Sequence, residues 1–258
     1  GLAKAFPPLQ LFSGINFEVK RGERVALIGN NGTGKTTILK IINELIPPDA
    51  GTVTLGSNVH IGYYDQEHQQ LHMEKTIFDE IADDYPNLNN TKVRNVLAAF
   101  LFTDDDVYKR IEDLSGGERG RVALAKLMLS DANFLILDEP TAGLDPMGRD
   151  EILDQIASLH ATRGITIILV SHSMEDIAKY VERIIVMNHG VKTFDDTPKK
   201  VFAHYKELEA IGLAAPQITY IMHALEEEGM DVDTSAINVD EATASILQAL
   251  RKKEEDHK

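Results

Sequence analysis

Residues 24–36, RVALIGNNGTGKT, decide the fold of this chain. Residues 24–29 form an apolar run bounded by charge and glycine, which is typical of a strand. Residues 29–36 match the pattern G-x-x-x-x-G-K-[ST] in full, and an apolar-periodic helix is expected from Lys35 to Leu45. A glycine-rich loop between a strand and a helix is the context in which this pattern binds phosphate. The stretch therefore predicts a P-loop nucleotide-binding protein.

The chemistry of this loop follows from its residue types. Gly29, Gly32 and Gly34 let the backbone pass close to phosphate, and the start of the helix adds a partial positive charge. Lys35 is expected to reach the β- and γ-phosphates, and the Thr36 hydroxyl to bind Mg²⁺. The predicted nucleotide-binding residues are Asn30, Asn31, Gly32, Thr33, Gly34, Lys35, Thr36 and Thr37. The alternative interpretation is a glycine-rich turn with an incidental lysine.

The rest of the chain alternates apolar strands with helical segments. Further strands are expected at 15–19, 52–55, 59–64, 134–138, 165–171, 183–187 and 191–194. Buried strands separated by helices indicate an α/β fold with a mostly parallel sheet, and the last two strands indicate an antiparallel edge. Residues 1–196 are predicted to form one ATPase domain with a helical subdomain at about 67–113. Residues 197–258 are predicted to form a C-terminal helical extension.

Composition narrows the function classes. The 258 residues carry 26 basic and 41 acidic side chains, a formal charge of −15, which argues against a broad nucleic-acid-binding surface. The chain has no cysteine, so disulfides, cysteine-ligated zinc and thiol nucleophiles are excluded. No apolar run approaches the ~20 residues that span a bilayer. We therefore expect a cytoplasmic protein.

A second candidate site lies at the end of the strand FLILD. Asp138 and Glu139 stand at its C-terminal end, which is where ligands bind in open α/β sheets. Asp138 is expected to hold Mg²⁺ through water, and Glu139 to polarise the attacking water. The alternative is a charged strand end that precedes a proline turn.

The segment LSGGE, residues 114–118, has two interpretations. Ser115 and Glu118 have the spacing of a capping box at a helix start. Gly116 and Gly117 in the first turn cost about 1 kcal/mol each relative to alanine, which a plain cap would not require. A serine-tipped helix start with bare N–H groups is a second anion site. Two protomers that face each other head to tail would use both sites, each ATP lying between one P-loop and the partner's LSGGE.

Together, the P-loop, LSGGE and LILDEPT resemble the motifs of an ABC-type ATPase domain, and the resemblance covers most of residues 1–194. It implies that Gln66, in GYYDQ, lies near Mg²⁺ and the attacking water. It also implies that Asp145, in AGLD, touches the partner's site and that His172, in LVSHS, contacts the γ-phosphate. Phe6 is placed where the family has the aromatic ring that stacks on adenine.

Each of these assignments has an ordinary structural alternative. Gln66 could be a polar loop residue, and His172 a structural histidine after a buried strand. Asp145 could cap the following helix, expected near 147–160, and could do both jobs. Phe12 competes with Phe6 as the adenine-stacking ring, and either ring could be part of the core.

The finer resemblance changes along the chain. Residues from about 6 to 141 resemble ABC-F proteins, the class that acts on ribosomes, in stretches such as LFSGINFEVKRGERVALIGNNGTGKTTILK and LSGGERGRVALAKLMLSDANFLILDEPT. Residues from about 142 to 258 resemble the ATP-binding subunit of energy-coupling factor importers, in ITIILVSHSMEDIAKYVERIIVMNHG and IGLAAPQITYIMHAL. The chain is therefore predicted to be a mosaic of the two, joined near DEPT.

Both resemblances imply an ATPase that uses ATP and Mg²⁺. The catalytic residues implied are Glu139, His172, Gln66 and Lys35, and the metal-binding residues are Thr36, Gln66 and Asp138. We expect the subunit to energise an importer of a small solute at the cytoplasmic face of the membrane. Its expected partners are a second ATPase protomer and a transmembrane coupling subunit, without direct contact to nucleic acid. The alternatives are a ribosome-associated translation factor and a nucleotide-gated clamp with little hydrolysis.

Overall fold

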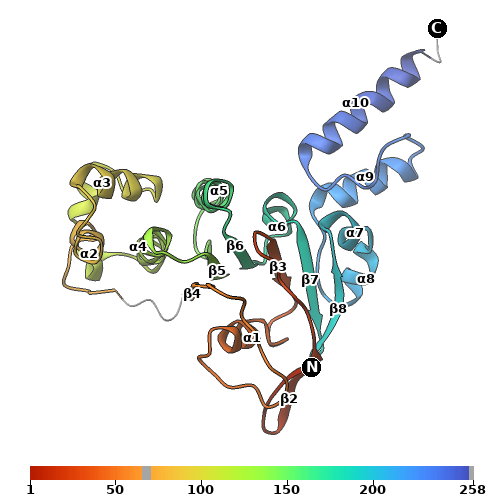
Figure 1. Ribbon diagram of the computed structural model, residues 1–258. Coiled ribbons are helices and arrows are strands. Elements are labelled where there is room, and N and C mark those ends of the chain that lie inside the picture. Colours follow the sequence, from red (N-terminus) through yellow and green to blue (C-terminus); the bar gives the residue numbers. More distant parts are fainter. Residues whose placement is uncertain (66–70, 256–258) are drawn as a thin grey trace.

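The computed structural model describes residues 1–65 and 71–255 and contains a six-stranded mixed sheet (Figure 1). The strands lie in the order β4-β5-β6-β3-β7-β8, and all pairs are parallel except β7 with β8. Their bounds are Ile61–Asp65 (β4), Phe134–Asp138 (β5), Thr166–Val170 (β6), Arg24–Ile28 (β3), Arg183–Asn188 (β7) and Val191–Asp196 (β8). The predicted α/β class, the mostly parallel sheet and its antiparallel edge are thus confirmed.

A separate antiparallel hairpin forms the N-terminal end of the chain. It consists of β1 (Leu2–Phe6) and β2 (Leu9–Ile15). The strand predicted at 15–19 is wrong, because β2 ends at Ile15, the first residue of the predicted strand. The strand predicted at 52–55 is also wrong, since that segment has no strand partner and residues 51–58 are exposed.

Helices cover both faces of the sheet. Helix α1 (Lys35–Ile42) packs on one face, where Leu27 of β3 and Ile38 share a core cluster. The other face is covered by α4 (Gly116–Leu129), α5 (Pro146–Arg163) and α6 (Met174–Tyr180), as Figure 1 shows. The neighbouring Ile28 belongs to this second cluster, as expected when successive side chains of a strand point to opposite faces. Helices α1 and α4 therefore lie on opposite sides of the sheet.

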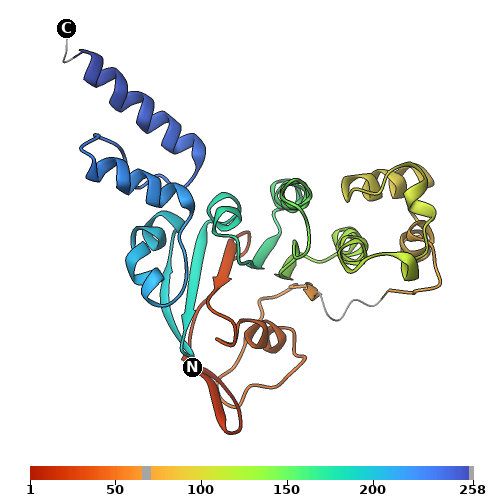
Figure 2. The same ribbon diagram turned by 180° about the vertical axis from the view of Figure 1, so that it is seen from behind.

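Residues 77–113 fold into helices beyond the β4 edge of the sheet (Figure 2). These are α2 (Ile77–Asp84), α3 (Asn90–Ala99) and the 3₁₀ turns η1 (Asp104–Tyr108) and η2 (Ile111–Asp113). The fully buried Glu80 of α2 lies 2.5 Å from Lys126 Nζ, so an ion pair ties these helices to α4. The Thr76 and Asn89 side chains cap α2 and α3, which fixes where each helix begins.

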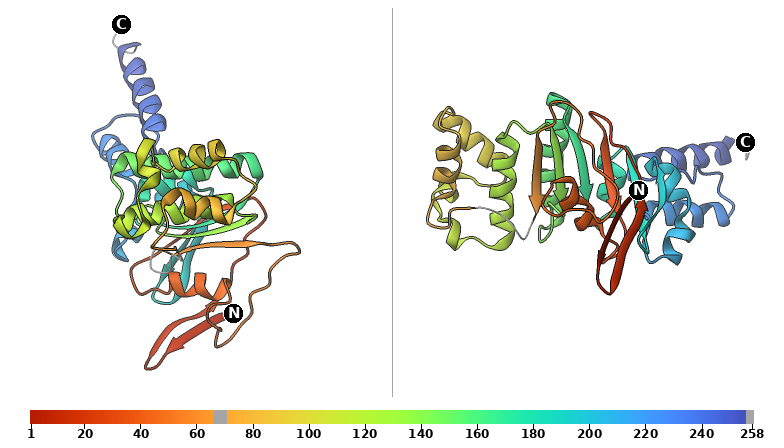
Figure 3. Two further views of the ribbon diagram at one scale, coloured as in Figure 1. Left: turned by 90° about the vertical axis from the view of Figure 1, so that its left-hand side faces the viewer. Right: turned by 60° about the horizontal axis from the view of Figure 1, so that its bottom comes forward.

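The C-terminal tail is helical, as predicted. It comprises α7 (Pro198–Ala203), α8 (Tyr205–Ala210), α9 (Gln217–Glu227) and α10 (Val239–Glu255). Figure 3 shows α9 and α10 at the end of the molecule opposite to α2 and α3, with the sheet between them. Met222, Ala236 and Ala242 form a small core of their own. Of the helices in the described ranges, none combines the length and the apolar composition that crossing a bilayer requires.

Candidate functional site

The P-loop joins the end of β3 to the start of α1. Gly34, the residue before α1, is left-handed with φ 95° and has no side chain that could cap the helix. A Cβ at this position would lie 2.6 Å from Phe12 Cδ1, because the loop packs directly on that buried ring. The glycine therefore permits both the turn and the close packing, and it leaves the helix start open to an anion.

The Lys35 side chain folds back into the loop. Its Nζ donates to the carbonyl oxygens of Gly29, at 2.6 Å, and Asn30, at 3.1 Å. Burial lowers the pKa of Lys35, whereas the nearby carboxylates of Glu139 and Asp138 act to raise it. The lysine is therefore held by the loop itself and lies within the field of the two strand-end carboxylates.

The other predicted loop residues fall into two groups. The Thr33 hydroxyl donates to the Asn30 carbonyl at 2.8 Å, and the exposed Asn30 side chain donates to the Ile211 carbonyl at 2.6 Å, so each side chain already has a protein partner. The side chains of Asn31 and Thr36 are exposed, and that of Thr37 is half-buried. The backbone and Thr36 can thus meet a ligand, while Asn30 and Thr33 shape the loop.

Asp138, Glu139 and His172 meet at the ends of two adjacent strands. Asp138 is buried and pairs in register with Val170 of β6. Glu139 has a positive φ of 53°, which is strained for a residue with a side chain. This conformation accompanies a contact of 2.7 Å between Glu139 Oε1 and His172 Nε2. The carboxylates predicted at the strand end are thus near Lys35, and Glu139 joins them to His172, which was predicted separately.

These residues also suit a magnesium ion. Asp138 and Thr36 offer oxygen atoms, which Mg²⁺ prefers, and Gln66 lies outside the described residues. Within residues 1–65 and 71–255, no group of three or more His, Asp or Glu side chains forms a complete metal site.

The predicted capping box at LSGGE is present. The Ser115 hydroxyl accepts from the Glu118 amide at 3.3 Å, while the Glu118 carboxylate accepts from the Ser115 amide at 2.8 Å and from its hydroxyl at 2.7 Å. Asp145 likewise caps α5 and accepts from the Gly148 amide at 2.7 Å. A Cβ on Gly117 would lie 3.8 Å from the Gly143 carbonyl oxygen, so the two capped helix starts are neighbours.

The two candidate adenine-stacking rings have different environments. Phe6 is 50% exposed at the end of β1, with Lys4 Nζ 5.5 Å from the centre of its ring. Phe12 is 1% exposed and packs in the core beside α1. Only Phe6 is therefore accessible to a base, and Phe12 has the structural role.

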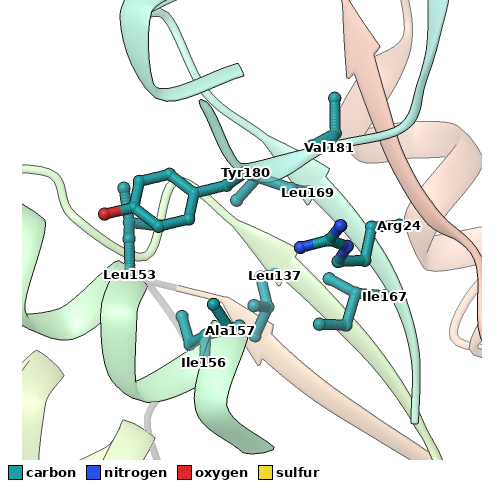
Figure 4. A pocket seen from close by; sticks show the side chains of 9 residues that line it. All are labelled: Arg24, Leu137, Leu153, Ile156, Ala157, Ile167, Leu169, Tyr180 and Val181. Atoms are coloured by element: carbon teal, nitrogen blue, oxygen red, sulfur yellow. The ribbon is translucent and has the colours of Figure 1, made fainter. Parts of the chain in front are cut away.

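A cavity of about 20 Å³, room for one water molecule, lies away from this site, between α5, α6 and the sheet (Figure 4). It is lined by Arg24, Leu137, Leu153, Ile156, Ala157, Ile167, Leu169, Tyr180 and Val181. None of these residues was predicted to bind nucleotide. The candidate site lies instead at the carboxyl ends of β5 and β6, next to the P-loop that follows β3.

The sequence profile of the ABC transporter family matches residues 12–142. Fold, motifs and profile together define an ABC-type ATPase that binds and hydrolyses ATP. The chain is 38% identical over 260 residues to the energy-coupling factor transporter ATP-binding protein EcfA2 of Clostridium tetani, covering 93% of this chain and 90% of that one. It therefore belongs, within the ABC transporter family, to the ATP-binding proteins of energy-coupling factor transporters.

Two further similarities refine this result. The solved structure of cbiO1 from Clostridium perfringens, part of the ABC transporter complex cbiONQ, matches with a TM-score of 0.65 and 29% identity. That match covers 87% of this chain and 96% of cbiO1. The chain is also 46% identical over 182 residues to the ATP-binding protein YdiF of Bacillus subtilis, covering 70% of this chain and 27% of YdiF. The identity to YdiF is thus higher than that to EcfA2 but covers a smaller part of the chain, and the predicted mosaic stays a prediction.

Proposed function

We propose that this chain energises the uptake of a small solute by an energy-coupling factor importer, at the cytoplasmic face of the membrane. The observation that carries this role is the extent of the similarity to EcfA2. Coverage of 93% of the chain cannot be reached without most of the helical tail from residue 197. The tail therefore belongs to the shared architecture, with residues 1–196 as the ATPase domain and 197–258 as its helical extension.

The proposed chemistry depends on residues of the P-loop, on residues at the carboxyl ends of β5 and β6, and on the exposed ring of Phe6. The start of α1 and the Lys35 ammonium bind the β- and γ-phosphates, because both carry positive charge toward the loop. Asp138, Thr36 and Gln66 would hold Mg²⁺, which neutralises phosphate charge when bound. Phe6 stacks on adenine, since its ring is exposed.

Glu139 is the general base for the attacking water. Its carboxylate now contacts His172 Nε2 at 2.7 Å, so the two side chains hold each other in place. With ATP bound, the Nε2–H group of His172 donates to the γ-phosphate, and Glu139 accepts a proton from water. The strained backbone at Glu139 supports this role, because such strain persists where the surrounding structure imposes it.

A second copy or a related cassette completes the site. Helices α1 and α4 pack on opposite faces of the sheet, so Ser115 serves the P-loop of a partner rather than its own. Asp145, next to this helix start, reaches the same partner site. Helices α2 and α3, beyond the sheet edge, form the subdomain that receives a transmembrane coupling subunit.

Co-purification from the source cells tests the transport role. Tagged protein is extracted with its membranes in mild detergent, and its partners are identified by mass spectrometry. We expect a hydrophobic membrane subunit to be recovered together with ATP turnover. Recovery of ribosomal proteins instead would support the ABC-F-type role that residues 6–141 resemble. ATP-dependent dimers without turnover would support a nucleotide-gated clamp.

A further inference from the structure

The P-loop is tied to the C-terminal tail by one side chain. Asn30 Nδ2 donates to the carbonyl oxygen of Ile211 at 2.6 Å, across 181 residues of sequence. Ile211 is the C-terminal cap of α8, and carbonyl groups at a helix end lack partners within the helix. The Asn30 amide supplies the partner that this carbonyl needs.

The end of α8 is rigidly defined. Gly212 has φ +79° and donates to the Glu209 carbonyl at 2.9 Å, while Leu213 donates to the Leu208 carbonyl at 2.9 Å. These two bonds form a Schellman motif, which fixes the direction of the Ile211 carbonyl. Leu213 is buried in the same core cluster as the sheet, so this helix end cannot move independently of the ATPase fold.

The same segment is also tied to the other side of the nucleotide site. The Gln217 amide donates to Glu175 Oε1 at 3.2 Å, and Glu175 lies in the first turn of α6, three residues after His172. Between these ends, Ala215 is buried in the sheet's core. Residues 211–217 therefore span from the P-loop to the helix that follows the His172 loop.

We propose that residues 211–217 are a brace of the nucleotide site and that Asn30 is a positioning residue of the P-loop, acting through the Ile211 carbonyl. This inference rests on the proposed binding of ATP at the P-loop. The Asn30 carbonyl accepts from Lys35 Nζ at 3.1 Å and from the Thr33 hydroxyl at 2.8 Å. Because the same residue is anchored by its side chain, the tail sets the position of the carbonyl that holds the lysine.

Two substitutions break the brace from opposite ends. Asn30→Ala removes the donor, and Gly212→Ala introduces a Cβ within 3.0 Å of Asn30 Nδ2 at a left-handed position. Losing one hydrogen bond of this kind should weaken ATP affinity about 2- to 10-fold and raise KM more than it changes kcat. The matched control is Gly229→Ala, which has the same backbone cost at φ +85° in the tail but open space around the new Cβ. We expect it to bind ATP like the wild type.

A double-mutant cycle completes the test on the full-length chain. Asn30→Ala with Gly212→Ala should weaken ATP binding no more than either change alone, because both break one contact. Thermal unfolding of each variant checks that it is folded. Wild-type affinity in both single variants, equal weakening by Gly229→Ala, or additive effects in the double variant would overturn the brace. Lys35→Ala tests ATP binding at the P-loop independently of the brace. Unchanged ATP affinity in that variant would refute nucleotide binding at the P-loop itself.

Discussion

Helices α1 and α4 begin in different ways, although both starts were predicted as anion sites. Helix α1 follows the left-handed Gly34 and has no side-chain cap. Helix α4 follows Ser115, whose amide and hydroxyl are both bonded to the Glu118 carboxylate. The first start has no side-chain partner for its N–H groups, whereas at the second the Ser115 hydroxyl accepts from the Glu118 amide.

This difference suggests an order of events. Lys35 lies within the P-loop and close to Glu139, the proposed base, so this start can take up the triphosphate first. At the second start the Ser115 hydroxyl is bonded to the Glu118 carboxylate, so donating it to a phosphate costs one hydrogen bond to a charged group. We therefore expect contacts between Ser115 and phosphate to form only after nucleotide is bound at the partner's P-loop. Substitutions at the nucleotide site and at the start of α4 test these separate roles.

The largest effect is expected for Glu139→Gln. The amide keeps the size of the side chain but cannot accept a proton from water, so turnover should fall about 10²- to 10⁴-fold. ATP binding should persist, because the P-loop is unchanged. Phosphate release and equilibrium binding of ATP measure the two properties. Turnover at the wild-type rate would show that Glu139 is not the general base.

Lys35→Ala should act on affinity instead. The substitution removes a buried ammonium that the loop carbonyls hold in place, and with it the charged hydrogen bond to phosphate that we propose. Such bonds contribute enough to weaken ATP binding roughly 10- to 100-fold when one is lost. Lys40→Ala, on the same helix away from the loop, is the control and should bind ATP normally. Titration with a fluorescent ATP analogue measures both.

Mixing two inactive chains tests whether the site is composite. Lys35→Ala disables the P-loop, and Ser115→Arg fills the space in front of α4. In a head-to-tail pair of one chain of each kind, one site carries both changes and the other carries neither. An equal mixture should therefore recover about a quarter of the wild-type turnover if pairing is random and the sites are independent. No recovery, with mixed dimers present, would contradict the composite site.

The sequence predicted local features better than pairings. The strand ending at Asp138 and the cap at Ser115 follow from patterns within a few residues, and both are present. The segment 52–55 has strand-like composition, but a strand also needs a neighbour, and none pairs with it. The Asn30–Ile211 contact joins residues too distant for any periodicity to indicate. The sequence therefore did not indicate which groups far apart in the chain meet in the fold.

The smallest effect is expected for Glu118, the carboxylate of the capping box. Hydrogen bonds from the Ser115 amide and then from its hydroxyl lower the pKa of Glu118 below the ordinary value of 4.5. The stability that this carboxylate contributes is therefore present above the unfolded-state pKa and is lost as the pH falls through the lower folded-state pKa. Glu118→Gln keeps the shape without the charge and should cost about 0.3–1 kcal/mol at neutral pH, from the lost interaction with the helix start. Thermal unfolding of both proteins across this acidic range should show the gap closing as the pH falls, whereas a constant gap would mean that the charge contributes nothing to the cap.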